Sequence, residues 1–172
     1  IAAGFVAEAL RAGLLVPGVP ANPNVAQVIN LSLGGLDDRT CSPGYDAMLA
    51  RALSPTGTRA IVAAAGNDDG DADLSVPSSC PSTIAVAATT ATGDRAPYSN
   101  RGATVDLAAP GGSGSTFATL MTILVNHGKT SATDAFGITA GAGTSFATPV
   151  VAGVIGLVLA VAPGLAPGQV RS

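Results

Sequence analysis

Apolar residues along this chain gather in short runs separated by glycine, proline and polar residues. Runs of this length are typical of parallel strands that are buried on both faces. They predict strands over residues 25–33, 59–65, 83–88 and 105–108, and a further strand over 120–125. Gly34 and Gly35 end the first run and Gly66 ends the second, because glycine interrupts regular strands.

Helical spacing of apolar residues appears in other segments. Ile1, Phe5, Ala9 and Ala12 fall on one face, which predicts an amphipathic helix over residues 1–13. Short helices are predicted over residues 45–53 and from 163 onward. Residues 150–162 are all apolar or glycine, but the run is shorter than the roughly 20 residues that a bilayer-spanning helix needs. We therefore expect a buried core helix over 150–162.

The alternation of strands and helices predicts an α/β fold with a mainly parallel sheet. The 172 residues contain no stretch long enough to be a flexible linker, so residues 1–172 are expected to belong to one domain. In open parallel sheets, ligands bind beyond the carboxyl ends of the strands. The glycine-rich strand ends at Gly34-Gly35 and Gly66-Asn67 are therefore candidate parts of a functional site.

Composition narrows the class of protein. Hydrophobic residues make up 47% of the chain and charged residues only 11%, with a net charge of -3. The basic residues are scattered and form no cluster suited to phosphate backbones or anionic lipid. We therefore expect a compact domain that binds neither nucleic acid nor membranes.

Ser145 is the candidate for chemistry. It lies among small residues just before the apolar run, where the first turn of a helix offers unpaired N–H groups to developing negative charge. A structural alternative is that Thr144 or Ser145 only caps the helix. The pattern around Ser145 also has the G-x-S-x-A form of an α/β-hydrolase elbow, but no Asp, Glu or His follows it, as that fold would require.

Five segments together resemble the subtilisin-like (subtilase) serine proteases, in the order in which that family has them. The resemblance rests on residues 28–35, 62–67, 76–81, 98–111 and the stretch 143–153, which reads Gly-Thr-Ser-Phe-Ala-Thr-Pro-Val-Val-Ala-Gly. It implies a three-layer subtilisin-like α/β fold, with a mainly parallel sheet flanked by helices. It also implies that residues 1–172 are the central and C-terminal part of a peptidase S8 catalytic domain, incomplete at both ends.

The resemblance also assigns roles to residues. Ser145 would be the nucleophile, and Asn67 would join the Ser145 N–H in the oxyanion hole. An extended polypeptide substrate would lie along the first strand end and in a pocket whose walls are small or apolar. The residues implied are Ser32, Leu33, Gly34, Ala64, Ala65 and Gly66. Such walls predict a preference for uncharged side chains at the cleavage position.

Cys41 and Cys80 are the only cysteines. Composition leaves open whether they form one disulfide or remain as two buried thiols, and they are too few for a usual zinc site. Secreted bacterial subtilases often carry a disulfide between the loops in which these two residues lie. The resemblance therefore implies a Cys41–Cys80 bridge, an oxidising compartment and an extracellular location.

The family's catalytic Asp and His motifs are absent from these residues and are expected upstream of Ile1. The single histidine, His127, lies where the family has no base, and we interpret it as a loop residue. Because a serine hydroxyl without a base is a weak nucleophile, this piece alone is expected to be inactive. The alternative is a subtilase-like domain that has lost catalysis and serves binding or structure.

No metal or cofactor is expected in this segment, although structural calcium could bind elsewhere in the full protein. Asp69, Asp71 and Asp73 alternate like the start of a calcium loop, but Leu74 and Cys80 stand where Gly and Glu are needed. Gly112, Gly114 and Gly128 do not complete a phosphate-binding motif. The full protein is expected to be a monomer, and a propeptide could precede it.

Overall fold

The computed structural model describes residues 13–14, 17–36, 40–54, 56–113, 116–128, 131 and 133–172. The amphipathic helix predicted over residues 1–13 therefore lies almost wholly outside the described residues.

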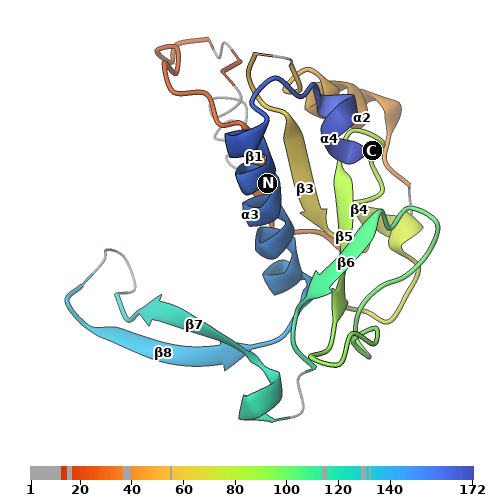
Figure 1. Ribbon diagram of the computed structural model, residues 1–172, viewed down its shortest axis with the longest axis vertical. Helices are drawn as coiled ribbons and strands as arrows, with labels where there is room; N and C mark the ends of the chain where they lie inside the picture. Colours follow the sequence, from red (N-terminus) through yellow and green to blue (C-terminus); the bar gives the residue numbers. More distant parts are fainter. Residues whose placement is uncertain are drawn as a thin grey trace.

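A parallel sheet of four strands forms the centre of the fold (Figure 1). Its order is β1 (Val28–Leu31), β3 (Ala60–Ala64), β5 (Ile84–Thr89) and β6 (Leu107–Pro110). All four predicted strands are present and pair in parallel, which confirms the α/β prediction. β1 is shorter than the run over 25–33, because the ends of a strand are set by pairing with its neighbour, here β3, and not by hydrophobicity alone.

Alternate residues of the sheet face two separate apolar clusters, as the twofold period of a strand requires. One cluster joins Ala60, Val62, Ile84 and Val86 to α3 (Thr144–Val161) through Ala147, Val151, Ile155 and Leu159. The other joins Ile29, Leu31, Ile61 and Ala63 to Leu49 of α2 (Pro43–Ala50), to Ala52 and to Cys80. The sheet is therefore the middle of three layers.

Helix α3 is buried on one face only, which corrects the expectation of a buried core helix. Its opposite face exposes Val154 by 53%, Leu157 by 71% and Val161 by 88%. Apolar composition alone could not distinguish a helix covered on all sides from one packed on a single sheet. By length and composition α3 is also the one described helix that could cross a membrane, although its buried face packs on the sheet.

The remaining elements lie around this sheet. Strands β7 (Met121–Asn126) and β8 (Phe136–Gly141) form an antiparallel hairpin that extends away from the body (Figure 1). β2 (Gly35–Leu36) pairs with β4 (Ser75–Val76), and η1 (Ala72–Leu74), η2 (Phe117–Thr119) and α4 (Pro167–Arg171) are short. β7 and α4 were predicted. β8 was missed because its glycines and threonine hide any regular alternation.

Helix α2 begins two residues earlier than predicted. The Ser42 hydroxyl accepts a hydrogen bond from the Tyr45 N–H, and Pro43 occupies the first helical turn. A serine cap and an early proline are both favourable at a helix N-terminus. The local sequence therefore set the start of α2 even though the apolar pattern placed it later.

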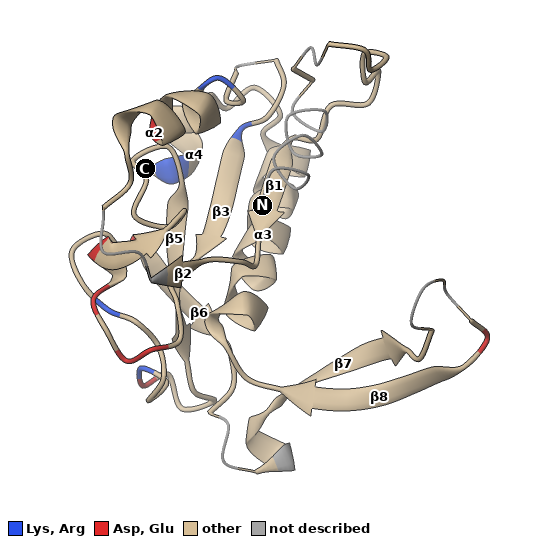
Figure 2. Cartoon of the chain, turned by 180° about the vertical axis from the view of Figure 1, so that it is seen from behind, with Lys and Arg blue, Asp and Glu red and all other residues tan. Residues whose placement is uncertain are grey.

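Among the described residues, the charged ones are concentrated in loops and near element ends, and none lies on α3 (Figure 2). The acidic turn after β3 illustrates the pattern. The Asp69 carboxylate pairs with Arg95 at 2.8 Å and with Arg101 at 2.5 Å. Asp73 accepts a hydrogen bond from the Thr104 hydroxyl at 2.8 Å. These carboxylates thus link the loop after β3 to the loop after β5.

Candidate active site

The carboxyl ends of β1 and β3 meet the N-terminus of α3 around a cavity of about 330 Å³. The residues that line it are Ser32, Leu33, Gly34, Gly35, Ala64, Gly66, Asn67, Asp68, Thr144 and Ser145. All the predicted catalytic, oxyanion and substrate-binding residues are among them except Ala65, which is fully buried. Gly35 was a candidate from its place at a strand end. Asp68 and Thr144 were not predicted as site residues, although each is adjacent in sequence to a predicted one.

Ser145 lies in the first turn of α3, and it does not cap the helix. The N-cap residue is Gly143, and no side chain makes a capping hydrogen bond at this end. The structural alternative of a simple Ser or Thr cap is therefore excluded. The first-turn N–H groups and the helix dipole favour negative charge at this position.

Asn67 is held in one orientation by Thr144. Its side-chain Oδ1 accepts hydrogen bonds from the Thr144 N–H at 2.8 Å and from the Thr144 hydroxyl at 3.0 Å. Because a backbone N–H can only donate, this contact identifies the oxygen of the amide. The amide nitrogen Nδ2 is then the atom with which Asn67 can donate to a ligand.

The loop that carries Asn67 is shaped by Asn100, which is fully buried. Asn100 Oδ1 accepts hydrogen bonds from the N–H groups of Asp68 and Gly70, and its Nδ2 donates to the Ala65 carbonyl. Gly66 has a φ of +104°, and a Cβ there would lie 2.3 Å from Asn100 Nδ2. A glycine is required at this position on both counts. Asn100 lies in segment 98–111 of the family resemblance, but that resemblance gave it no role.

Tyr98 is linked to the start of α3 through Gly111. Its hydroxyl lies within hydrogen-bonding distance of the carbonyls of Gly111 (2.8 Å) and Gly112 (2.7 Å). The Gly111 carbonyl also accepts a hydrogen bond from the Gly143 N–H at 2.9 Å. Burial raises the pKa of the Tyr98 phenol above its ordinary value, and a backbone hydrogen bond at Gly143 opposes this shift. The phenol therefore stays a neutral donor.

His127 lies apart from the cavity. It follows β7, and its backbone N–H donates to the Ala135 carbonyl at 3.0 Å. Its ring lies against Gly137 of β8. It is not among the residues that line the cavity. This placement agrees with its interpretation as a loop residue.

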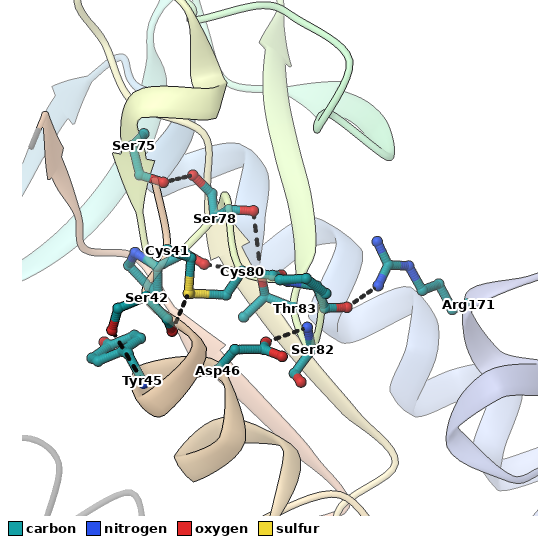
Figure 3. Close-up of a disulfide and its surroundings, with 12 residues drawn as sticks. Cys41, Ser42, Tyr45, Asp46, Ser75, Ser78, Cys80, Ser82, Thr83 and Arg171 are labelled. Atoms are coloured by element: carbon teal, nitrogen blue, oxygen red, sulfur yellow. Dashed lines mark hydrogen bonds between the residues drawn. A yellow bond between two sulfur atoms is a disulfide. The ribbon is translucent and has the colours of Figure 1, made fainter. Parts of the chain in front are cut away.

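Cys41 and Cys80 form a disulfide, which joins the segment before α2 to the loop before β5 (Figure 3). The same region is tied by Asp46, whose carboxylate accepts a hydrogen bond from the Ser82 N–H at 2.8 Å. The Arg171 guanidinium donates to the Pro81 carbonyl nearby. The predicted bridge is thus present on the α2 face of the sheet, where Cys80 is part of the apolar cluster around Ile61 and Cys41 packs against it.

Comparison with known proteins gives consistent matches. The model of the subtilase family (peptidase S8) matches residues 7–172. An extracellular protease of Xanthomonas campestris is 42% identical over 97% of this chain, and an extracellular serine proteinase of Thermus sp. is 39% identical over 84% of it. A solved structure titled as proteases from Pseudoalteromonas arctica has a TM-score of 0.86 at 34% identity and covers 97% of this chain.

The chain is short beside these proteins. It spans 27% of the Xanthomonas protein, 31% of the Thermus protein and 48% of the Pseudoalteromonas chain. The parallel sheet between helices agrees with the subtilisin-like fold of the structural neighbours. Since the family model covers nearly all of these residues, the chain belongs to the subtilase family.

Proposed function

We propose that this chain is the part of a serine endopeptidase that carries the nucleophile, Ser145, and the oxyanion donor, Asn67. The observation that supports this most directly is their common position around one cavity, with Ser145 in the first turn of α3 and Asn67 oriented by Thr144. The family relatives that match the chain include proteins named as extracellular proteases.

In the proposed reaction the Ser145 Oγ attacks the carbonyl carbon of a peptide bond while a base accepts the hydroxyl proton. The resulting oxyanion would accept hydrogen bonds from Asn67 Nδ2 and from the Ser145 N–H, and the helix N-terminus adds a favourable dipole. Collapse of the tetrahedral intermediate breaks the C–N bond. The amine leaves with the proton, and an ester to Ser145 remains. Water then hydrolyses the ester and restores the hydroxyl.

The base and the carboxylate that orients it are proposed to come from sequence outside these 172 residues. The one histidine of the chain, His127, lies on the hairpin away from the cavity. Without a base the Ser145 hydroxyl would be a weak nucleophile, so the 172-residue piece alone is expected to be inactive. The proposed chemistry needs no metal or cofactor from this segment.

The substrate is proposed to be an extended polypeptide, bound through the main chain of Ser32–Gly34 as an added strand. The cavity walls formed by Leu33, Ala64 and Gly66 are small or apolar, which supports a preference for uncharged side chains. Among the described residues that line the cavity, Asp68 is the one that carries a charge. Cleavage of a peptide library mainly after Lys or Arg would reject the uncharged preference and assign the pocket's specificity to Asp68.

The disulfide and the relatives named extracellular support secretion of the full protein. We expect it to act as a monomer.

A fluorophosphonate probe on the full-length protein tests the function, since it reacts with an activated serine. We expect labelling at Ser145, its loss in Ser145→Ala, and normal labelling in Ser131→Ala, which changes an exposed serine on the hairpin. Asn67→Ala should reduce peptide hydrolysis by about 100-fold or more, the size found for such a donor in subtilisin itself. A folded protein that is neither labelled nor active would instead support the non-catalytic binding domain.

A further inference from the structure

Pro149 interrupts the hydrogen bonds of α3 one turn after the nucleophile. It lies inside the helix, and a proline has no N–H to donate. In an α-helix the N–H of residue 149 would bond to the carbonyl of residue 145. The Ser145 carbonyl therefore lacks its regular α-helical donor, at the residue that carries the proposed chemistry.

A side chain from a distant part of the chain donates to this carbonyl. The Ser32 hydroxyl donates to the Ser145 carbonyl oxygen at 2.7 Å, across a sequence separation of 113 residues. Ser32 Oγ in turn accepts a hydrogen bond from Asn30 Nδ2 at 3.0 Å. The three groups form a chain of hydrogen bonds in which each bond polarises the next. It runs from the end of β1 to the first turn of α3.

We propose that Ser32 is a positioning residue for Ser145, supplying the hydrogen bond that Pro149 cannot donate. The orientation of the Ser145 carbonyl depends on the ψ angle of this residue, so holding that carbonyl also holds the backbone from which the side chain projects. A nucleophile must be kept within about 0.5 Å of its productive position. The Ser32 hydroxyl is thus committed to the nucleophile, while its main chain remains available to substrate.

This inference rests on the proposed function for its catalytic consequence, but the hydrogen bond can be tested separately. Ser32→Ala, Pro149→Ala and the double variant of the full-length protein form a double-mutant cycle. In Pro149→Ala the backbone gains an N–H that can bond to the Ser145 carbonyl. Loss of the Ser32 hydroxyl should then lower kcat and the unfolding midpoint by less than it does when Pro149 is present.

For peptide hydrolysis, we expect Ser32→Ala to lower kcat about 3- to 10-fold with little change in KM, the size of one lost hydrogen bond. Ser32→Thr, which keeps a hydroxyl, should retain most of the rate. In the Pro149→Ala background the loss caused by Ser32→Ala should fall below about twofold. Ser172→Ala is the matched control, because its hydroxyl also donates to a helix carbonyl, that of Gln169, far from the cavity. It should leave kcat unchanged.

The second measurement is the unfolding midpoint of the same four proteins of the cycle. We expect Ser32→Ala to lower the midpoint when Pro149 is present and to lower it less when Pro149 is replaced. Equal effects of Ser32→Ala in both backgrounds, or a rise in KM at constant kcat, would overturn the positioning role. If no variant or parent hydrolyses peptides or reacts with fluorophosphonate, the proposed function fails, while the unfolding cycle still decides whether the Ser32 bond compensates for Pro149.

Discussion

The two faces of the central sheet are held by different means. On one face, α3 contributes an 18-residue helix without charge, and its side chains pack directly on β3 and β5. On the other face, α2 has only eight residues and one buried residue, Leu49. The Cys41–Cys80 disulfide reinforces the same side. A long apolar helix stabilises by burial, whereas a short helix needs covalent and polar links as well.

The largest effect is expected from removing the disulfide, which tests the α2 face. Its closed loop spans 39 residues, and the loss of this constraint on the unfolded chain should cost about 4 kcal/mol of unfolding free energy. Urea unfolding of the full-length protein carrying Cys41→Ser and Cys80→Ser measures this. A loss of unfolding free energy below about 1 kcal/mol would mean that the α2 face does not depend on the disulfide for its stability.

The α3 face is tested by Ile155→Ala, which leaves a cavity against the sheet. We expect a loss of about 3 kcal/mol, within the range for buried Ile. Leu157→Ala is the matched control, because that side chain is 71% exposed and its truncation should change stability by less than about 0.5 kcal/mol. Equal losses in the full-length protein would show that a segment outside these residues covers the exposed face of α3.

A smaller effect is expected from Asp46→Ala on the α2 face. The change removes the acceptor for the Ser82 N–H and a negative charge from the first turn of α2, where the helix dipole favours it. We expect a loss of about 1 kcal/mol in urea unfolding. The exposed Asp134, on the hairpin, is the control. If Asp46→Ala and Asp134→Ala lowered the free energy of unfolding equally, the hydrogen bond to Ser82 would not contribute to the stability of this face.

The smallest effect is expected at Asp69, in the loop beyond β3. Hydrogen bonds from Arg95 and Arg101 lower its pKa below the ordinary value of 3.8. Because the folded pKa is the lower one, the stabilisation is present above pH 3.8 and is lost as the pH falls through the folded pKa. The ion pairs of Asp69 with Arg95 and Arg101 are exposed, so their contribution to the free energy of unfolding is small. Unfolding of Asp69→Asn should differ from the parent at neutral pH and converge with it in acid, and a constant difference would contradict this.

Local sequence determined much of the fold. Continuous apolar runs predicted all four strands of the sheet, because a strand covered on both faces shows its burial in its own residues. Resemblance in several ordered segments predicted the family, the disulfide and most of the residues that line the cavity. Ala65 was also predicted as a wall residue, but it is fully buried and is not among the residues that line the cavity. An apolar residue next to a strand end looks the same in the sequence whether it lines a cavity or lies in the core.

The sequence by itself determined which segments form strands and helices and which residues could carry chemistry. Tertiary structure decided which face of α3 is covered and how the cavity residues are oriented. Thr144 meets Asn67 across 77 residues and Ser32 meets Ser145 across 113. The physical reason is that hydrophobic periodicity is a property of neighbouring residues, whereas a hydrogen bond between distant segments exists only after the sheet has brought the strand ends and the helix start together.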